Sequence, residues 1–165
     1  MKEVKVKALT AEAFRDLGTF MSVTDPQGYA LEGTYHTFYR DQVKFIPNTE
    51  DPVCFSVLTV RKNPEFVISC LEYHDHTEEI QLPMDSDVVL CCAPANDGDL
   101  DPEQVEAFLI PKGTLLCLKR GTWHDVLYPV GKRKVNVLIG LPERIYHNDI
   151  VVKEVPDTKI KLIFD

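Results

Sequence analysis

The chain has 165 residues, of which 44% are hydrophobic, and a formal net charge of −8 at pH 7. This length predicts one globular domain over residues 1–165, with a core large enough to be stable. The acidic balance excludes nucleic acid and anionic membranes as expected partners, because both attract basic surfaces. No apolar stretch has the length of a signal core or a membrane span, so we expect a soluble, cytoplasmic protein.

The first predicted elements are a strand and a helix. Residues 4–8 alternate between apolar side chains and lysines, a pattern typical of an edge strand. Residues 10–18 predict a helix. Thr10 supplies an oxygen for the first free N–H groups, and Gly18 suits a left-handed end. We therefore expect a short helix near the N-terminus.

From residue 35 onwards the pattern is almost entirely that of β-strands. Short β-branched and aromatic runs are separated by clusters of Pro, Gly, Asn and Asp. The predicted strands cover residues 35–39, 53–60, 66–73, 88–93, 107–110, 114–118, 134–141 and 150–155. Many short strands with almost no helix favour an all-β sandwich or barrel over alternating strands and helices.

Two further features are interpreted as structural. The five cysteines are odd in number, lack a Cys-x-x-Cys spacing and lie in apolar runs, so we interpret them as reduced core residues. The acidic segment 97–103 has Pro102 where a calcium-binding EF-hand loop requires glycine. We interpret Asp101 as the N-cap of a short helical turn that begins at Pro102.

The strongest chemical signal follows the predicted strand at residues 66–73. Glu72, His74 and His76 alternate along the chain, so a continuous strand places all three on one face. Glu79 adds a carboxylate a few residues later. Imidazole nitrogens and carboxylate oxygens suit Zn, Ni, Mn or Fe(II). The stretch therefore predicts a divalent metal ion as the cofactor.

A second chemical stretch ends at Trp123 and His124. A Pro-x-Gly turn leads into the strand at 114–118, and Gly121 permits another turn that places His124 at the start of the next strand. A single histidine beside tryptophan is more often a packed residue with a satisfied hydrogen bond. It becomes a candidate metal ligand here because the earlier stretch offers partners.

Together these stretches resemble the two motifs of the cupin superfamily, whose fold is a double-stranded β-helix or jelly roll. The usual first motif is His-x-His followed by Glu after three or four residues. Two registers of this motif fit the sequence. In the first, His74 and His76 are the pair, and Glu79 follows His76 too closely. In the second, Glu72 takes the place of the first histidine and His74 is the second, and Glu79 then follows at the usual spacing. We prefer the second register, with Glu72, His74, Glu79 and His124 as the inner set and His76 as an accessory ligand or proton carrier.

Within the cupins, the chain resembles the ureidoglycolate lyase family of purine catabolism. The resemblance rests on residues 9–18, on Leu71-Glu72-Tyr73-His74 with Pro83-Met84 ten residues further on, and on Ala107-Phe108, Gly113 and Trp123-His124 with Pro129. The chain departs from the family pattern at Glu79, where we expect an amide, and in the additional His76. These departures predict a more acidic and more metal-competent site.

The resemblance implies an activity. It implies a lyase that cleaves the carbon–nitrogen bond of a small ureido or hydroxy acid, giving glyoxylate and urea from ureidoglycolate, and it implies a homodimer. Two alternatives stay open: another metal-dependent cupin enzyme, such as a sugar isomerase or an oxygenase, and a non-enzymatic cupin that binds a small molecule. The fold does not choose among them.

The resemblance also implies roles for individual residues. His74, Glu79 and His124 are predicted to hold the metal, and Glu72 or His76 to move the proton. Arg61, at the end of the strand at 53–60, is predicted to bind the substrate carboxylate, unless it is an ordinary exposed charge. Trp123 either packs in the core or forms a wall of the substrate site.

Overall fold

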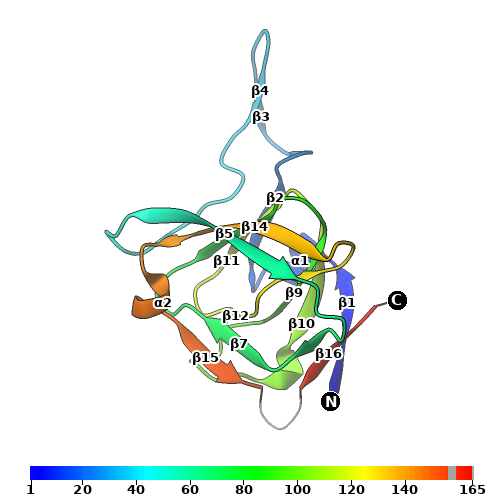
Figure 1. Ribbon diagram of the computed structural model, residues 1–165. Helices are drawn as coiled ribbons and strands as arrows, with labels where there is room; N and C mark the ends of the chain where they lie inside the picture. Colours follow the sequence, from blue (N-terminus) through cyan, green and yellow to red (C-terminus); the bar gives the residue numbers. More distant parts are fainter. Residues whose placement is uncertain (156–158, 165) are drawn as a thin grey trace.

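Two β-sheets pack against each other in the computed structural model, which describes residues 1–155 and 159–164 (Figure 1). Within these residues the larger sheet has nine strands: β15 (Val151–Glu154), β7 (Cys70–Tyr73), β12 (Trp123–His124), β9 (Val88–Ala93), β10 (Glu106–Ile110), β1 (Lys2–Ala8), β16 (Ile160–Ile163) and β6 (Val67–Ile68) in order, with β13 (Tyr128–Pro129) paired to β9. The five-stranded sheet follows the order β2 (Gly18–Ser22), β11 (Thr114–Leu118), β8 (Glu79–Pro83), β14 (Lys134–Pro142) and β5 (Val53–Arg61). The architecture is a jelly roll, which confirms the predicted fold class.

The remaining described elements are small. They are α1 (Ala11–Phe14), α2 (Ile145–Asn148), the 3₁₀ turn η1 (Pro102–Gln104) and a two-stranded hairpin of β3 (Ala30–Glu32) and β4 (Thr37–Tyr39). No helix in the described part of the chain is long and apolar enough to cross a membrane. The predicted turn at Pro102 is confirmed, since the Asp101 side chain accepts a hydrogen bond from the Glu103 N–H at 2.9 Å.

Two hydrophobic clusters lie on opposite faces of the larger sheet. Along β9, Val88, Leu90 and Cys92 belong to the cluster between the two sheets, whereas Val89, Cys91 and Ala93 belong to the other cluster. Only Ser69 separates β6 from β7, although β6 ends the order of the sheet and β7 lies near its other end. The larger sheet therefore curls around the second cluster, which explains why β9 is apolar on both faces.

The N-terminal strand is not at an edge, so that part of the prediction is wrong. β1 runs parallel to both its neighbours, with Val6 opposite Ala107 and Val4 opposite Leu162. The alternation of lysines with apolar residues reports which face of a strand meets water. It carries no information about whether the hydrogen-bonding edges of that strand are occupied.

The predicted helix is shorter than expected. Thr10 is its N-cap, accepting a hydrogen bond from the Ala13 N–H at 3.2 Å, but the helix ends at Phe14. Gly18 does not terminate it and instead begins β2, where a Cβ atom would lie 2.3 Å from the carbonyl oxygen of Cys117. The glycine is required here by close approach to the neighbouring strand rather than by a left-handed backbone.

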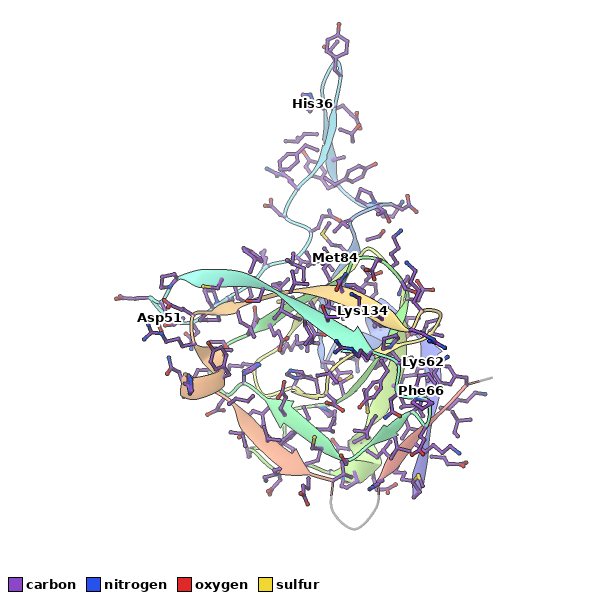
Figure 2. All side chains as sticks on the ribbon, in the orientation of Figure 1. His36, Asp51, Lys62, Phe66, Met84 and Lys134 are labelled. Atoms are coloured by element: carbon purple, nitrogen blue, oxygen red, sulfur yellow. The ribbon has the colours of Figure 1, made fainter. Side chains whose placement is uncertain are left out.

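The β3–β4 hairpin projects away from the barrel, as Figures 1 and 2 show, and His36 lies near its far end. Leu31 pairs with Phe38 on one face of the hairpin, and both side chains are exposed. A two-stranded hairpin on its own is only marginally stable in water. We refer to residues 23–50, which carry this hairpin, as the arm.

All five cysteines are free thiols, as predicted, but not all of them lie in the core. Cys91, Cys92 and Cys117 are buried, and burial raises the pKa of the Cys117 thiol to about 12, which keeps it protonated. Cys54, however, is exposed on β5 and lines a pocket.

Candidate active site

Strands β7 and β12 place one carboxylate and one imidazole side by side. Glu72 on β7 lies directly opposite His124 on β12 in their antiparallel pairing. Glu72 also lines the main pocket of the protein, and the His124 Nε2 atom lies 3.9 Å from Glu72 Oε1. Facing residues of an antiparallel pair project to the same side of the sheet, so both side chains point into the barrel.

His74 joins them from the loop that follows β7. The strand ends at Tyr73, and the next turn is held by Asp149, whose carboxylate accepts hydrogen bonds from the backbone N–H groups of residues 75, 76 and 77 at 2.7, 2.9 and 3.1 Å. The expected alternation along a continuous strand therefore stops before His76. His74 is buried, whereas the side chain of His76 is 69% exposed and lies outside this group.

Glu79, at the start of β8, lies between the two buried imidazoles. Its Oε2 atom is 3.2 Å from His74 Nε2 and 2.9 Å from His124 Nε2. Its Oε1 atom accepts a hydrogen bond from the Gln81 side-chain amide at 3.0 Å. The structure thus brings together the inner set of the preferred register, Glu72, His74, Glu79 and His124, through three separate strands and a loop.

The outer nitrogens of both imidazoles are committed to backbone carbonyls. His74 Nδ1 donates to the carbonyl of Asp149 at 2.5 Å, and His124 Nδ1 donates to the carbonyl of Thr122 at 2.8 Å. Because a carbonyl oxygen only accepts, both Nδ1 atoms carry hydrogen, and both Nε2 atoms are turned toward the interior of the site. This is the arrangement in which histidines bind metal ions through Nε2.

The charges of these groups depend on one another. Burial alone would lower the pKa of His124, but the Glu79 carboxylate outweighs it and raises that pKa to about 9. The same balance, with the hydrogen bond to Glu79 opposing burial, raises the pKa of His74. Burial would raise the pKa of Glu79, yet the two imidazoles hold it well below its usual range. The ionised Glu79 carboxylate therefore favours positive charge beside it, at the two Nε2 atoms.

A metal ion is one way to supply that charge, and the donor set fits one. Glu72, His74 and His124 each offer a ligand atom, and these atoms lie within 4.8 Å of one another. His124 Nε2 is buried and has no hydrogen-bond partner, because its 2.9 Å approach to Glu79 lacks the alignment of a hydrogen bond. Nitrogen and oxygen ligands of this kind suit a divalent ion.

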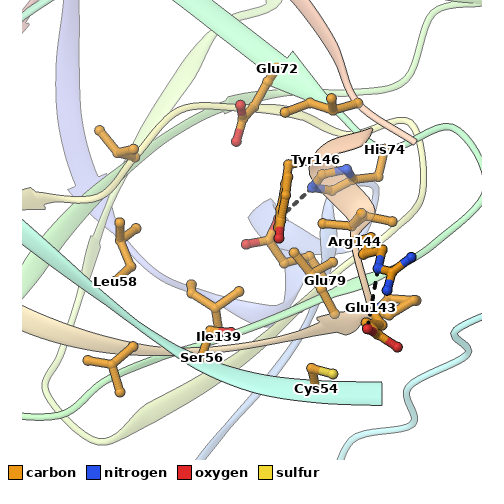
Figure 3. A pocket seen from close by; sticks show the side chains of 16 residues that line it. Cys54, Ser56, Leu58, Glu72, His74, Glu79, Ile139, Glu143, Arg144 and Tyr146 are labelled. Atoms are coloured by element: carbon orange, nitrogen blue, oxygen red, sulfur yellow. Dashed lines mark hydrogen bonds and ion pairs between the residues drawn. The ribbon is translucent and has the colours of Figure 1, made fainter. Parts of the chain in front are cut away.

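Three of these four side chains line a pocket of about 570 Å³ (Figure 3). Glu72, His74 and Glu79 line one side of it, and inward residues of β5, among them Ser56 and Leu58, line another. The segment from Pro142 to Tyr146 lines the mouth. The Glu72 side chain is 33% exposed, whereas those of Glu79 and His124 are 7% and 3% exposed. Glu72 is thus the most accessible of these acids and bases.

The surroundings of Glu72 raise its pKa. Burial raises it, and the negative charge of Glu79 raises it further, while His124 opposes the shift. A carboxylate with a raised pKa that lines a pocket is a stronger base than an exposed one.

The sequence model of one protein family, described as ureidoglycolate lyase, matches residues 1–160. The chain belongs to the ureidoglycolate lyase family. It is 27% identical over 132 residues to the ureidoglycolate lyase of Rhodobacter capsulatus, an alignment that covers 79% of this chain and 81% of that protein. The family predicted from the sequence motifs is therefore confirmed.

The solved structures that match the chain are more distant. dTDP-6-deoxy-D-glucose-3,5-epimerase from Legionella pneumophila has a TM-score of 0.42 and 9% identity, with 86% of this chain and 76% of that one covered. A variant of oxalate decarboxylase from Bacillus subtilis has a TM-score of 0.41 and 14% identity, with 76% of this chain and 35% of that one covered.

For this member of the family, the structure separates Arg61 from the pocket. Arg61 ends β5 opposite Lys134, beyond the part of that strand that lines the pocket, and it is exposed. Arg144 occupies the pocket mouth instead, where its Nε atom lies 3.4 Å from Glu143 Oε1 (Figure 3). Its backbone is left-handed, with φ of 61°, an uncommon conformation for a residue other than glycine.

Trp123 lies in the hydrophobic cluster outside the barrel interior. Its ring is fully buried, packs edge-on against Tyr73 with centroids 4.5 Å apart, and donates through Nε1 to the carbonyl of Asp99 at 3.0 Å. Consecutive strand residues face opposite ways, so the placement of His124 inside requires Trp123 outside. The structure supports the core-packing interpretation of Trp123.

Sequence reasoning did not find Arg144 or Asp149. Both lie in the segment that follows β14, about 70 residues after His74, and no motif or periodic pattern marks them. The run Pro142-Glu143-Arg144 was a detectable signal for a turn. Nothing in the sequence indicated that this turn closes over the histidines.

Proposed function

We propose that the protein is a ureidoglycolate lyase, which cleaves ureidoglycolate to glyoxylate and urea in the cytoplasmic breakdown of purines. The observation that carries the proposal is the family match over residues 1–160. The pocket supports it, because it combines a proton acceptor, a set of metal-binding side chains and a cation at its mouth. Neither alternative function has comparable support.

The reaction has simple chemical needs. Ureidoglycolate carries a hydroxyl group, a carboxylate and a urea nitrogen on one carbon. Cleavage removes the hydroxyl proton, forms the carbonyl of glyoxylate, breaks the carbon–nitrogen bond and protonates the departing nitrogen. The site must therefore accept one proton, return it and fix the substrate carboxylate.

Glu72 is the group that we assign to proton transfer. It is the accessible carboxylate of the cluster, and burial and Glu79 raise its pKa. In its ionised form it accepts the hydroxyl proton, and in its protonated form it delivers that proton to the urea nitrogen. His76, the other predicted candidate, lines two other pockets and not the one that Glu72 lines.

Arg144 is the group that we assign to the substrate carboxylate. A guanidinium binds a carboxylate through two parallel N–H donors. Its present partner Glu143 is half exposed, so exchange for a substrate carboxylate costs little desolvation. This assignment replaces Arg61.

His74, Glu79 and His124 would hold a divalent ion, because Glu79 Oε2 lies 3.2 Å and 2.9 Å from the two Nε2 atoms. Glu72 is adjacent and offers a further ligand atom within 4.8 Å of those of the two histidines. When bound, such an ion would polarise the substrate hydroxyl and lower its pKa. The protein's own contribution is to present both Nε2 atoms inward and to keep Glu79 ionised between them.

The deciding experiment measures both products. Protein prepared without chelator, and then with Zn²⁺, Ni²⁺, Mn²⁺ or Fe²⁺ added, is incubated with ureidoglycolate, and glyoxylate, urea and ammonia are measured. We expect glyoxylate and urea in equal amounts above the spontaneous rate, and no ammonia, because an enzyme that hydrolyses the ureido end would release ammonia. Glu72→Gln serves as the matched inactive control. Release no faster than the spontaneous rate with every metal contradicts the proposal.

We further propose that the protein forms a homodimer, as the family resemblance implies. The arm supports this, because Leu31, Tyr35 and Phe38 are 42%, 97% and 58% exposed. Phe55 and Val57 are also exposed, on β5. Apolar surface of this extent marks an interaction site. Light scattering should give twice the chain mass, and the double variant Tyr35→Ser, Phe38→Ser should give the chain mass. A monomeric wild-type protein contradicts the proposal.

A further inference from the structure

Asp149 makes more polar contacts than any catalytic candidate, although it does not line the main pocket. Its Oδ1 accepts from the N–H of Asp75, and its Oδ2 accepts from the N–H groups of His76 and Thr77 and from the Thr77 hydroxyl at 3.2 Å. The residue is almost fully buried, with 9% exposure. Four donors converge on two oxygens, which only an ionised carboxylate satisfies.

The backbone of Asp149 completes a ring of hydrogen bonds. Its carbonyl oxygen accepts from His74 Nδ1 at 2.5 Å, so side chain and main chain of one residue together hold the turn from His74 to Thr77. The carbonyl of Asp149 decides where the imidazole of His74 points, and the carboxylate fixes the position of that carbonyl.

Asp149 also ends the short helix α2, whose first turn belongs to the pocket mouth. Its N–H donates to the carbonyl of Ile145 at 2.8 Å, which ends α2. That short helix begins after Arg144, and Arg144, Ile145 and Tyr146 all line the pocket. The position of the mouth and the orientation of His74 thus depend on the same residue.

We propose that Asp149 is a positioning residue that couples the orientation of His74 to the placement of Arg144 and the pocket mouth. The proposal deepens the proposed function and rests on it for its catalytic consequence. Its structural content is independent, because the hydrogen bonds exist whatever the substrate. Outer partners of histidine ligands contribute about 10- to 100-fold to metal affinity or activity.

The test compares Asp149→Asn with Asp75→Asn. The first variant keeps the shape but replaces one of the two acceptor oxygens with an N–H donor, which then faces at least one of the four donors around the carboxylate. The second removes one negative charge from the same turn, where the Asp75 side chain is exposed and takes no part in the ring. Both proteins are measured metal-free by NMR of the His74 imidazole and are then titrated with Zn²⁺.

In the wild type and in Asp75→Asn, we expect a slowly exchanging His74 Nδ1 proton. In Asp149→Asn this proton should exchange rapidly, and Zn²⁺ affinity should fall by about 10- to 100-fold. With ureidoglycolate, Asp149→Asn should lower kcat, because it disturbs the orientation of His74. It should also raise KM, because it disturbs the segment that carries Arg144 at the pocket mouth. An unchanged Nδ1 proton in Asp149→Asn overturns the proposal.

A milder variant covers the case in which Asp149→Asn does not fold. Thr77→Val keeps the shape of a buried residue and removes only the hydroxyl bond to Asp149, so faster Nδ1 exchange and weaker Zn²⁺ binding are expected at smaller amplitude. Unchanged exchange in this variant counts against the proposal. If wild-type protein does not cleave ureidoglycolate, the proposed function fails, while the NMR comparison still decides the role of Asp149.

Discussion

The two faces of the β7–β12 strand pair meet very different surroundings. On the inner face, Glu72 and His124 lie in a polar cluster with charges that compensate one another. On the outer face, Tyr73 and Trp123 pack in an apolar cluster. Neighbouring residues in the sequence therefore have separate roles. Side chains on the inner face form the candidate active site, whereas side chains on the outer face stabilise the sheet by apolar packing. A change on either face should alter one property and spare the other.

The largest effect is expected on the outer face. Trp123→Ala removes the largest fully buried side chain and leaves a cavity, so the free energy of unfolding should fall by about 3–5 kcal/mol. Urea titration measures this loss. Trp123→Phe keeps most of the apolar contact and loses the hydrogen bond to Asp99, so its loss should be about 1 kcal/mol. Equal losses for both variants would show that packing is not what Trp123 contributes.

The inner face should respond in function rather than in folding. His124→Ala removes a central nitrogen of the cluster, and we expect Zn²⁺ affinity and turnover of ureidoglycolate to fall by more than about 100-fold. His76→Ala, an exposed imidazole two residues from His74, is the matched control and should change neither. Isothermal titration and product assays give both quantities. A loss of Zn²⁺ binding in His76→Ala would instead favour the register in which His74 and His76 are the pair of metal ligands.

Two arginines extend the comparison beyond the strand pair. Arg144 lies at the pocket mouth and Arg61 outside it, so Arg144→Ala should raise KM by about tenfold with a smaller change in kcat. Arg61→Ala should leave both constants unchanged. Steady-state kinetics distinguish these outcomes, and the opposite result would show that the mouth rearranges when substrate binds.

The smallest effect concerns pH and the metal-free inner face. An imidazole ordinarily titrates near 6.5, and Glu79 raises the pKa of His124 to about 9 in the folded protein. The charged pair therefore stabilises the fold fully below pH 6.5, and this stabilisation is lost as the pH rises through 9. The Tm of chelator-treated protein should fall by several degrees from pH 6.5 to 9.5. Glu79→Gln should abolish most of this dependence, and a flat wild-type profile would contradict the charge assignment.

The sequence predicted the inner face because strand alternation is a local property, whereas it left the place of Trp123 open between the core and the substrate site. Glu72 and His124 could be assigned to the inner set from spacing and family motifs, and most strand boundaries follow from β-branched runs between turns. β2, β8 and β16 escaped prediction. Residues 79–82 and 160–162 do alternate between polar and apolar types, but these runs are too short to stand out, and Gly18 at the start of β2 was interpreted as a helix end. The family resemblance supplied what the pattern alone lacked.

The parts of the site that were missed depend on tertiary contacts. His76 was placed beside His74 by extending the strand, but Asp149 captures the backbone of residues 75–77 and turns the chain away. Arg144 reaches the pocket only because β14 delivers the following segment to the open end of the barrel. No local signal records contacts between residues this far apart.

The parallel position of β1 has a consequence for how the protein comes to be folded. Val6 pairs with Ala107 and Val4 pairs with Leu162, so β1 completes its pairing only when two segments far along the chain, β10 and β16, are both available. Contacts between such distant residues slow folding, because the loop must close before any contact is gained. Until then the edges of β10 and β16 are open to other chains. Expression at low temperature or with a chaperone should therefore raise the soluble yield more than any change in the active site.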